Sequence, residues 1–303
     1  MEALVKQTVE AYFRWMPFSP DMSKNLQNAL TGSDDLSSQF QTQFLSQVTD
    51  DKYRRTLPSA SNKFLKKLIS ALEEAKVEVS DELYDLLATT MSSGCESEHF
   101  YKTYFVGHIH FCLAESAEFL SQGTTGLRTW EAAEFMLDWC QKNPKETSNK
   151  HLLELGSGLG YLGIGLIKLG LARRVIMTDC HPQVLANLRH NCSVNLDEES
   201  FSVRRIDWTE EGQSDPVDQT EVVIASDVVF DPKIVPSLVQ SIRRLLVAGA
   251  ERALIACTVR NEGTLAVFEK SITESEGLSF DYVATEGVEH DAHVRLYNIF
   301  KDL

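Results

Sequence analysis

The chain after residue 150 alternates between short apolar segments and longer amphipathic ones, and this alternation restricts its fold more than any other feature. The apolar segments predict strands at residues 151–155, 175–178, 201–206, 221–225 and 253–258. Helical periodicity between and after them predicts helices at residues 161–171, 182–195, 235–246 and 267–275. Two further strands, 280–285 and 294–300, follow one another directly. We therefore expect an α/β fold, a doubly wound, largely parallel, seven-stranded Rossmann-like sheet with an antiparallel C-terminal hairpin.

The first hundred residues lack this alternation and carry helical patterns instead. Apolar residues recur at helical spacing over residues 1–16, 64–72 and 81–91. Two short strands around Gly107-His108 and a helix at residues 131–140 then lead to the first strand of the sheet. We therefore divide the chain into an α-helical N-terminal region, residues 1–100, and a sheet-forming domain, residues 101–303. Because the sheet domain does not need the helices, we expect the N-terminal region to recognise a substrate.

Charge and cysteine content limit the partners and the compartment. The chain has 44 Asp and Glu residues against 29 Lys and Arg, which gives a formal net charge of −15. This charge repels phosphate backbones, so we expect no nucleic-acid partner. The sequence has no run of 18 apolar residues, so we expect no membrane span. Its six cysteines are scattered and form no Cys-x-x-Cys pair, which is typical of reduced thiols rather than metal ligands. We expect a cytoplasmic, monomeric protein without a bound metal.

A glycine-rich segment joins the first predicted strand of the sheet to the helix that follows it. Residues 152–160 read LLELGSGLG, so Gly156, Ser157 and Gly158 come after Glu154, which is still on the strand. Glycines at such a turn let the backbone bend sharply and approach a ligand closely. Asp179 ends the next strand, 23 positions after Gly156. In a doubly wound sheet this places a carboxylate where the hydroxyl groups of a ribose would lie.

The spacing of the glycines distinguishes between two classes of nucleotide site. Gly158, Gly160 and Gly163 match the dinucleotide fingerprint Gly-x-Gly-x-x-Gly, but the match begins three residues beyond the strand. The pattern in phase with the strand is acid-x-Gly-x-Gly-x-Gly starting at Glu154, which is typical of S-adenosylmethionine-dependent methyltransferases. These enzymes bind no pyrophosphate and need carboxylates for the ribose and the ammonium group instead. We therefore expect S-adenosyl-L-methionine as the cofactor, and a glycine-rich turn without a ligand is the alternative.

Acidic and aromatic residues follow the third and fourth strands of the predicted sheet. Asp207 could accept a hydrogen bond from an adenine amino group and Trp208 could stack on the ring, although ordinary core packing would also explain the tryptophan. Asp227 and Phe230 come after the fourth strand and would face the methyl group and the incoming nucleophile. The alternative for Asp227 is a strand-end residue that caps the next turn.

Together these residues resemble the seven-β-strand methyltransferases of family sixteen, the protein-lysine methyltransferase group. That family shows the acid-x-Gly-x-Gly-x-Gly turn, an acidic-Trp pair after the third strand and Asp-x-x-Tyr or Asp-x-x-Phe after the fourth. Residues 126–133, GLRTWEAA, match its Gly-x-x-x-Trp-x-Ala-Ala setting. Residues 81–84, 122–130 and 258–261 are similar to the branch that methylates a lysine of eukaryotic elongation factor two. Phe230 departs from the more common tyrosine and removes a hydroxyl group from the site.

The resemblance implies a role for each matching residue. The cofactor contacts that it implies are Trp130, Gly156, Ser157, Gly158, Asp179, Trp208 and Ala225. Asp227 would meet the substrate lysine, and Phe230 would shape its channel. The implied activity is transfer of methyl groups from S-adenosylmethionine to a lysine ε-amine, with elongation factor two as the protein partner.

The charge of the attacking lysine restricts what Asp227 can do. The amine must be neutral to attack, yet with a pKa near 10.4 only about one lysine in 10³ is neutral at pH 7. A carboxylate stabilises the ammonium form. We therefore assign Asp227 to capture and orientation of the lysine and leave open whether it accepts a proton.

Three other functions fit parts of the pattern. An NAD-dependent oxidoreductase needs the dinucleotide fingerprint in phase with the strand, which the sequence lacks. A non-catalytic binding module with the same fold needs no intact motif, yet Glu154, Gly156, Asp179 and Asp227 are all present. A methyltransferase acting on another protein, an RNA or a small molecule would share the same cofactor residues, and RNA is disfavoured by the charge.

Overall fold

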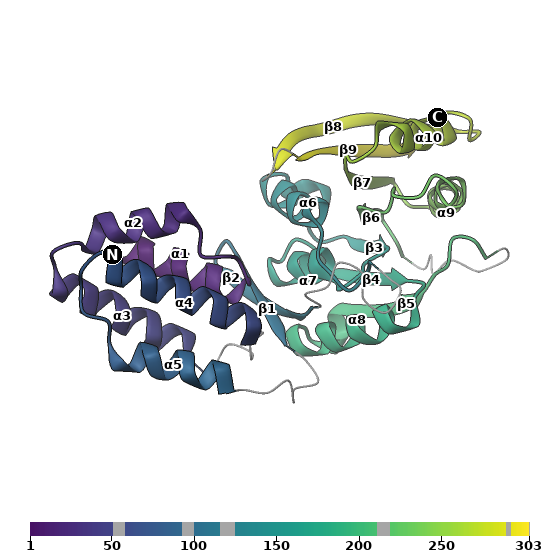
Figure 1. Cartoon of the computed structure of the whole chain (residues 1–303). Coiled ribbons are helices and arrows are strands. Elements are labelled where there is room, and N and C mark those ends of the chain that lie inside the picture. Colours follow the sequence, from purple (N-terminus) through teal and green to yellow (C-terminus); the bar gives the residue numbers. More distant parts are fainter. Residues whose placement is uncertain (51–57, 93–99, 116–124, 211–218, 289–291, 303) are drawn as a thin grey trace. The chain divides into compact units, whose positions relative to one another are not determined.

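The chain folds into two compact units, Met1–Glu115 and Ser116–Leu303, which we call the helical unit and the sheet unit. The computed structural model, drawn in Figure 1, describes residues 1–50, 58–92, 100–115, 125–210, 219–288 and 292–302. Cys95 and residues 122–124 of the predicted glycine-threonine segment lie outside the described residues. None of the described helices is long and apolar enough to cross a membrane.

The helical unit packs its helices around an aromatic core. Its helices are α1 (Glu2–Phe13), α2 (Pro20–Leu30), α3 (Asp34–Val48), α4 (Pro58–Glu74) and α5 (Asp81–Ser92). Tyr12 of α1 makes edge contacts with Phe44 of α3 and Phe64 of α4, with ring centroids 5.9 and 5.6 Å apart. These edge-to-face contacts add to the apolar burial that holds the helices together.

Two helices of this unit begin at serine caps that helical periodicity alone does not reveal. The Ser19 hydroxyl accepts a hydrogen bond from the Met22 backbone N–H at the start of α2, where Pro20 occupies the first helical position. The Ser33 hydroxyl accepts from the Leu36 N–H at the start of α3. Each cap satisfies a backbone donor that the first turn leaves free, so polar, serine-rich segments become helices.

A β-hairpin completes the helical unit and moves its boundary. Strands β1 (Tyr101–Val106) and β2 (Ile109–Ala114) pair antiparallel around the predicted turn, with Val106 opposite Ile109. Phe105 packs on the helical core, and its ring lies 6.4 Å from that of Phe13. The sequence placed the division at residue 100, whereas the units divide after Glu115, and Phe105 of the hairpin packs against the helical core.

The sheet unit contains the expected seven-stranded sheet. In chain order its strands are β3 (His151–Leu155), β4 (Arg174–Asp179), β5 (Phe201–Arg205), β6 (Val222–Ser226), β7 (Arg252–Thr258), β8 (Leu278–Val288) and β9 (Ala292–Lys301). The spatial order is β5-β4-β3-β6-β7-β9-β8. Strands β3 to β7 are parallel, and β9 runs antiparallel to both β7 and β8. The predicted parallel sheet with an antiparallel edge hairpin is confirmed.

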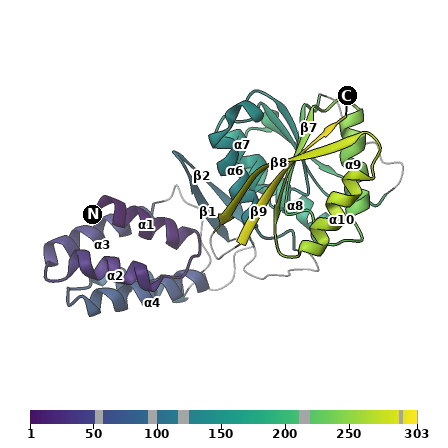
Figure 2. The ribbon, with the colours of Figure 1, turned by 90° about the horizontal axis from the view of Figure 1, so that it is seen from above.

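Helices cover both faces of this sheet (Figure 2). The helices α9 (Val235–Val247) and α10 (Glu262–Thr273) pack on the face formed by Leu153, Val223 and Ile255. On the other face lie α6 (Glu131–Lys142), α7 (Tyr161–Lys168) and α8 (Pro182–Asn195). The helix α10 begins five residues earlier than its apolar periodicity predicts, because the Asn261 side chain accepts from the Gly263 N–H at 2.8 Å and caps the first turn.

The chain order of the strands leaves a crevice at the carboxyl ends of the central strands. From β3 the chain moves outward through β4 to β5, and it then returns to the other side of β3 with β6 and β7. Ligands of doubly wound sheets bind at this reversal, outside the carboxyl ends of the central strands. Residues that follow β3, β4, β5 and β6 therefore meet at the same place.

Candidate functional site

The glycine-rich turn after β3 is held against the end of β4. The Ser157 N–H donates to the Thr178 carbonyl at 2.7 Å, and the Ser157 hydroxyl accepts from the Thr178 N–H at 3.0 Å. Gly156 has a φ of +64°, and a Cβ there would come within 2.7 Å of Val228 Cγ1. Only glycine fits this position, since both the left-handed backbone and the close packing exclude a side chain.

A cavity of about 330 Å³ opens beside this turn. Of the residues that the sequence singled out, those on its wall are Trp130, Glu154, Gly156, Ser157, Gly158, Asp179, Asp207, Trp208, Asp227 and Phe230. They come from the carboxyl ends of β3 and β4, from the segments after β3, β5 and β6, and from the start of α6. The reversal of strand order thus brings together residues that are up to 100 positions apart in the chain.

Ala225 is the one predicted contact that the structure places elsewhere. It is fully buried within β6, in the core on the α9 and α10 face of the sheet. Successive side chains of a strand point to opposite faces, so the next residue, Ser226, lies on the cavity wall instead. The cofactor contact predicted for Ala225 stays a prediction.

Glu154 is a buried carboxyl group with an unsatisfied oxygen. Its residue is only 1% exposed, and no described residue makes a hydrogen bond to its Oε2 atom. Burial raises the pKa of this carboxyl to about 8. A buried acceptor without a partner is unfavourable, and a cationic group bound in the cavity would relieve it.

Asp179 is fixed at the end of β4 by backbone donors. Its Oδ1 accepts from the His181 N–H at 3.0 Å, and its Oδ2 accepts from the Gly158 N–H at 3.3 Å. Burial raises the pKa of Asp179, although these backbone hydrogen bonds act in the opposite direction. The carboxylate therefore joins the glycine-rich turn to the neighbouring strand and faces the cavity.

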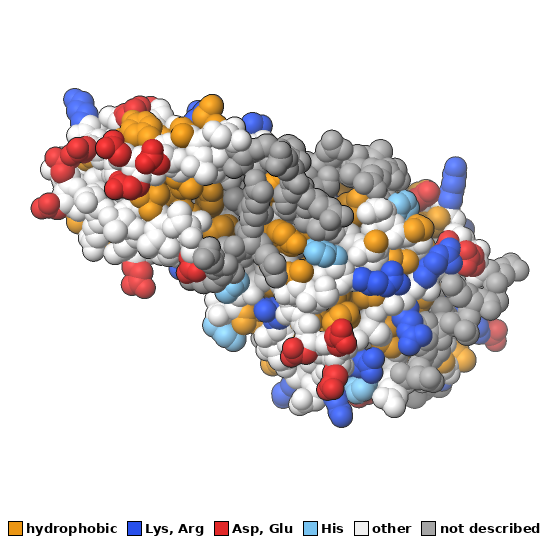
Figure 3. All heavy atoms as spheres, turned by 90° about the horizontal axis from the view of Figure 1, so that it is seen from below, with side chains coloured by type: hydrophobic (Ala, Val, Ile, Leu, Met, Phe, Trp, Pro, Cys, Tyr) orange, Lys and Arg blue, Asp and Glu red, His pale blue; other side chains and the backbone are white. Residues whose placement is uncertain are grey.

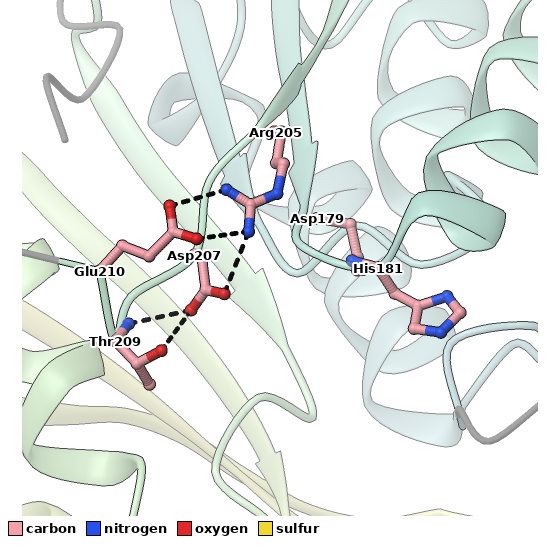
Figure 4. Close-up of polar contacts among 6 residues, drawn as sticks. All are labelled: Asp179, His181, Arg205, Asp207, Thr209 and Glu210. Atoms are coloured by element: carbon pink, nitrogen blue, oxygen red, sulfur yellow. Dashed lines mark hydrogen bonds and ion pairs between the residues drawn. The ribbon is translucent and has the colours of Figure 1, made fainter.

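Asp207 is oriented by a polar network outside the end of β5 (Figure 4). Its Oδ1 accepts from the Thr209 N–H at 3.0 Å and hydroxyl at 2.7 Å, and Arg205 lies 3.3 Å from its Oδ2. Arg205 is itself held by Glu210 through two bonds of 2.8 and 2.7 Å. The Thr209 hydrogen bonds, with a smaller contribution from Arg205, hold the pKa of Asp207 below its usual value. An ionised acceptor thus stands at the cavity wall.

Trp208 covers the glycine-rich turn. Two atoms of its six-membered ring would lie 3.5 Å from a Cβ at Gly156, so the indole packs directly over that residue. Its Nε1 atom is buried and has no hydrogen-bond partner among the described residues. The side chain also packs against the core on the α9 and α10 face, so it serves both as core and as cavity wall.

Asp227 is held in an unusual backbone conformation. Its φ is +54°, a left-handed value that is uncommon for a residue with a side chain. Its N–H donates to the Ala256 carbonyl, and its carboxylate accepts from the Thr258 N–H at 2.8 Å and hydroxyl at 2.9 Å. Its side chain is 7% exposed. The end of β7 thus positions a carboxylate that the sequence had placed only after β6.

The mouth of the cavity combines aromatic and cationic side chains. Phe230 lies on the wall and is 63% exposed, which is unusual for such a large apolar residue. Trp130 begins α6, and its Nε1 donates to the Thr125 carbonyl at 3.2 Å. The guanidinium groups of Arg128 and Arg260 lie 5.5 and 4.9 Å from the Trp130 ring centre. Cation–π contacts of this kind hold the indole at the rim.

Two residues of this region were not assigned a role from the sequence. Arg260 lies 3.2 Å from Asp227 Oδ2, and the hydroxyl of Thr258 donates to the same oxygen. Both belong to the segment 258–261, which the family resemblance had marked. Their position immediately after the strand beside β6 is the signal that could have linked them to Asp227. Among the described residues, no group of three or more His, Cys, Asp or Glu side chains could hold a metal ion.

Fold and site together define a class of protein. The reversal of strand order beside β3, the glycine-rich turn, the carboxylates after β3 and β4 and the antiparallel β8–β9 edge are the architecture of a Rossmann-like methyltransferase.

The comparisons with known proteins identify the family. The family model described as lysine methyltransferase matches residues 116–274. The chain is 36% identical over 224 residues to the protein-lysine N-methyltransferase EEF2KMT of Homo sapiens, which covers 68% of this chain and 67% of that protein. It is 32% identical over 242 residues to EEF2KMT of Bos taurus, with 71% of each chain covered. It is 31% identical over 233 residues to the protein-lysine N-methyltransferase EFM3 of Chaetomium thermophilum, with 67% and 69% covered. The chain belongs to the lysine methyltransferase family, and the resemblance noted in the sequence is confirmed.

Proposed function

We propose that this enzyme transfers methyl groups from S-adenosylmethionine to a lysine ε-amine of eukaryotic elongation factor two in the cytoplasm. The observation that carries the proposal is a cavity that holds the carboxyl groups of Glu154, Asp179 and Asp227, one each for the cofactor ammonium group, the ribose hydroxyls and the substrate lysine. The names of the relatives EEF2KMT support the choice of elongation factor two. We expect the enzyme to act as a monomer.

The residues of the cavity fit the cofactor. S-adenosylmethionine, when bound, supplies an electrophilic methyl group on a sulfonium. Glu154 has an unpaired buried oxygen that suits an ammonium group, and Asp179 suits the ribose hydroxyls. The ionised Asp207 suits an adenine amino group, and Trp208 offers an aromatic face. The glycine-rich turn lets these groups approach closely.

The residues at the mouth act on the lysine. Asp227 attracts and orients the side chain, and Phe230 and Trp130 form apolar walls that exclude water from it. Alignment of two bound groups is the main contribution that a protein makes to a displacement reaction of this kind. Phe230 provides its wall without a phenolic hydroxyl, so no proton transfer is assigned to it.

The charge distribution supports a protein rather than a nucleic acid as the substrate. The face drawn in Figure 3 carries Asp and Glu side chains over the helical unit, and acidic and basic side chains are mixed over the sheet unit. With a net charge of −15, the enzyme suits a lysine among basic neighbours.

Substitution of Asp227 tests the proposal. We expect Asp227→Asn and Asp227→Ala to lower the transfer of labelled methyl groups to purified elongation factor two by about 100-fold or more, because the lysine loses the carboxylate that orients it. Calorimetric titration should give the same Kd for S-adenosylmethionine as the unsubstituted enzyme. The amide oxygen of the Asn variant can still accept from the Thr258 N–H, whereas its amide nitrogen cannot accept from Arg260.

The matched control is Asp281→Ala, which removes an exposed carboxylate on β8 far from the cavity wall. It should leave both turnover and cofactor affinity unchanged. Near-normal turnover of the Asp227 variants would show that the carboxylate does not serve the lysine. Label on a different protein in a cell extract, with none on elongation factor two, would reject this substrate.

A further inference from the structure

Arg260 bridges three segments of the chain at the mouth of the cavity. Its Nη1 atom lies 3.2 Å from Asp227 Oδ2, and its Nη2 atom lies 2.8 Å from Glu131 Oε2. Its guanidinium also lies 4.9 Å from the ring centre of Trp130. One side chain after β7 therefore contacts the residue that follows β6 and two residues at the start of α6.

The bridge stands behind Asp227 rather than in the cavity. Asp227, Trp130 and Arg128 lie on the cavity wall, whereas among the described residues Arg260 and Glu131 are not part of it. The side chain of Asp227 is 7% exposed and that of Arg260 is 47% exposed, so the arginine approaches the carboxylate from the solvent side.

Among the described residues, Arg260 is the cation that contacts Asp227, and it also pairs with Glu131. Without Arg260 the nearly buried carboxylate of Asp227 would face the incoming lysine with no cation in contact with it. An excess negative charge stabilises the ammonium form of a lysine and so raises its pKa.

We propose that Arg260 is a positioning residue whose positive charge compensates the negative charge of Asp227. The bound substrate lysine then gives up its proton to solvent and presents a neutral amine. The inference rests on the proposed function. Asp227 still orients the lysine through its fixed carboxylate, while the paired guanidinium cancels the charge that would otherwise hold the proton on the amine. Asp227 thus orients the lysine, and Arg260 offsets the effect of Asp227 on the pKa of the lysine.

Other ionisable groups near Asp227 do not replace this pairing. Cys257 is buried in β7, and the same burial raises its pKa well above the ordinary value, so it stays neutral. The other ionisable residues on the cavity wall are Arg128, Glu154, Tyr161, Asp179, Cys180, His181 and Asp207. Arg260 is the cation that contacts Asp227 among the described residues.

The test compares Arg260→Gln with Arg260→Lys and with a control, Arg243→Gln. Arg243 lies on α9, where its Nε donates to the Glu276 carbonyl, outside the cavity wall. Single-turnover methylation of purified elongation factor two is measured from pH 6 to pH 10 at saturating cofactor. The Kd of each variant for elongation factor two is measured at pH 7 with S-adenosylhomocysteine bound, which needs no turnover.

For Arg260→Gln we expect the pH–rate profile to move upward by about one pH unit or more, because the lysine then faces an uncompensated carboxylate. The rate at pH 7 falls about tenfold, the difference from the unsubstituted enzyme becomes smaller as the pH approaches the pKa of the bound lysine, and the Kd for elongation factor two decreases. Arg260→Lys restores the profile, and Arg243→Gln leaves both measurements unchanged.

A loss of rate that is equal at every pH, or an increase in Kd, would overturn the inference and leave Arg260 with a structural role. A rate increase at pH 7 would also overturn it, because the arginine would then obstruct the lysine. If the unsubstituted enzyme transfers no methyl group to elongation factor two, the proposed function fails and the inference fails with it. Methylation by the unsubstituted enzyme with an unshifted variant profile overturns the inference alone.

Discussion

At the scale of single residues, the cavity depends on carboxyl groups held in unfavourable surroundings. Glu154 is buried with one oxygen unpaired, and Asp227 sits in a left-handed backbone conformation. Both conditions destabilise the folded protein without ligand, and both are common where a binding site is prepared in advance. We therefore expect the residues that serve function at this site to lower the free energy of unfolding of the protein without ligand.

The buried carboxyl of Glu154 predicts a pH-dependent stability. Its pKa rises from 4.5 to about 8 on folding, so the folded protein binds one more proton than the unfolded chain between these values. The contribution of Glu154 to the free energy of unfolding is therefore greatest below the unfolded pKa. It is lost as the pH rises toward about 8, and the loss is at most about 5 kcal/mol.

Glu154→Gln removes this titration, since its amide is neutral at every pH. We expect the difference in free energy of unfolding between Glu154→Gln and the unsubstituted protein to shift in favour of the variant from pH 5 to pH 8. Urea denaturation at several pH values, without cofactor, measures this difference. Two parallel stability curves would contradict the assignment of a neutral, buried carboxyl to Glu154.

At the scale of elements, α7 lies close to its neighbours because it carries two glycines. A Cβ at Gly163 would come within 2.7 Å of Met177 Sδ in β4. A Cβ at Gly165 would come within 2.5 Å of Leu137 Cδ2 in α6. Helix propensity favours alanine at both positions, so the glycines are explained by close packing. This packing fixes the start of α7 and with it the glycine-rich turn.

Gly165→Ala is expected to lower the free energy of unfolding by about 1–3 kcal/mol, because the added methyl group overpacks the contact between α6 and α7. The double variant Gly165→Ala with Leu137→Ala should lose less than the sum of the two single losses, since the shorter side chain makes room for the methyl group. Denaturant unfolding of all four proteins gives the comparison. A stabilised Gly165→Ala variant, as helix propensity alone would produce, would show that the contact is loose.

At the scale of the whole molecule, the two units have different tasks in our proposal. The lysine methyltransferase model matches residues 116–274, so the family match begins where the sheet unit begins. Phe105 of the hairpin Tyr101–Ala114 packs on the helices, and a cut at residue 100 would remove the surface that partly covers it. We propose that the helical unit recognises the protein substrate.

Removal of residues 1–115 tests this division of tasks. We expect the sheet unit alone to keep its Kd for S-adenosylmethionine, because the described cavity wall lies within residues 125–234. Methylation of elongation factor two should fall by at least about tenfold if substrate contacts are lost. Calorimetry and a labelled-methyl assay give the two measurements. Unimpaired methylation by the truncated protein would count against the proposed role of the helical unit.

Much of the site could be anticipated because residues at the ends of parallel strands must meet. Glu154, Asp179, Asp207 and Asp227 each follow or end a strand, and strand ends are readable from apolar periodicity. The side chain of Ala225 lies in the core and that of Ser226 lies on the cavity wall, because successive side chains of a strand point to opposite faces. The helices α2 and α3 were not delimited, since their serine caps carry a signal that periodicity does not contain.

The sequence by itself determined the class of fold, the cofactor turn and the acidic residues of the site, because these depend on local periodicity and on short spacings. Only the tertiary structure decided which charged side chains contact one another. Arg260, Glu131 and Asp227 are separated by up to 129 positions and meet only when β6, β7 and α6 are packed together. The tertiary structure likewise decided that the hairpin belongs with the helices, because the grouping depends on the apolar surface against which Phe105 packs. Ionisation and burial arise from neighbours in space, and the order of residues along a chain does not specify those neighbours.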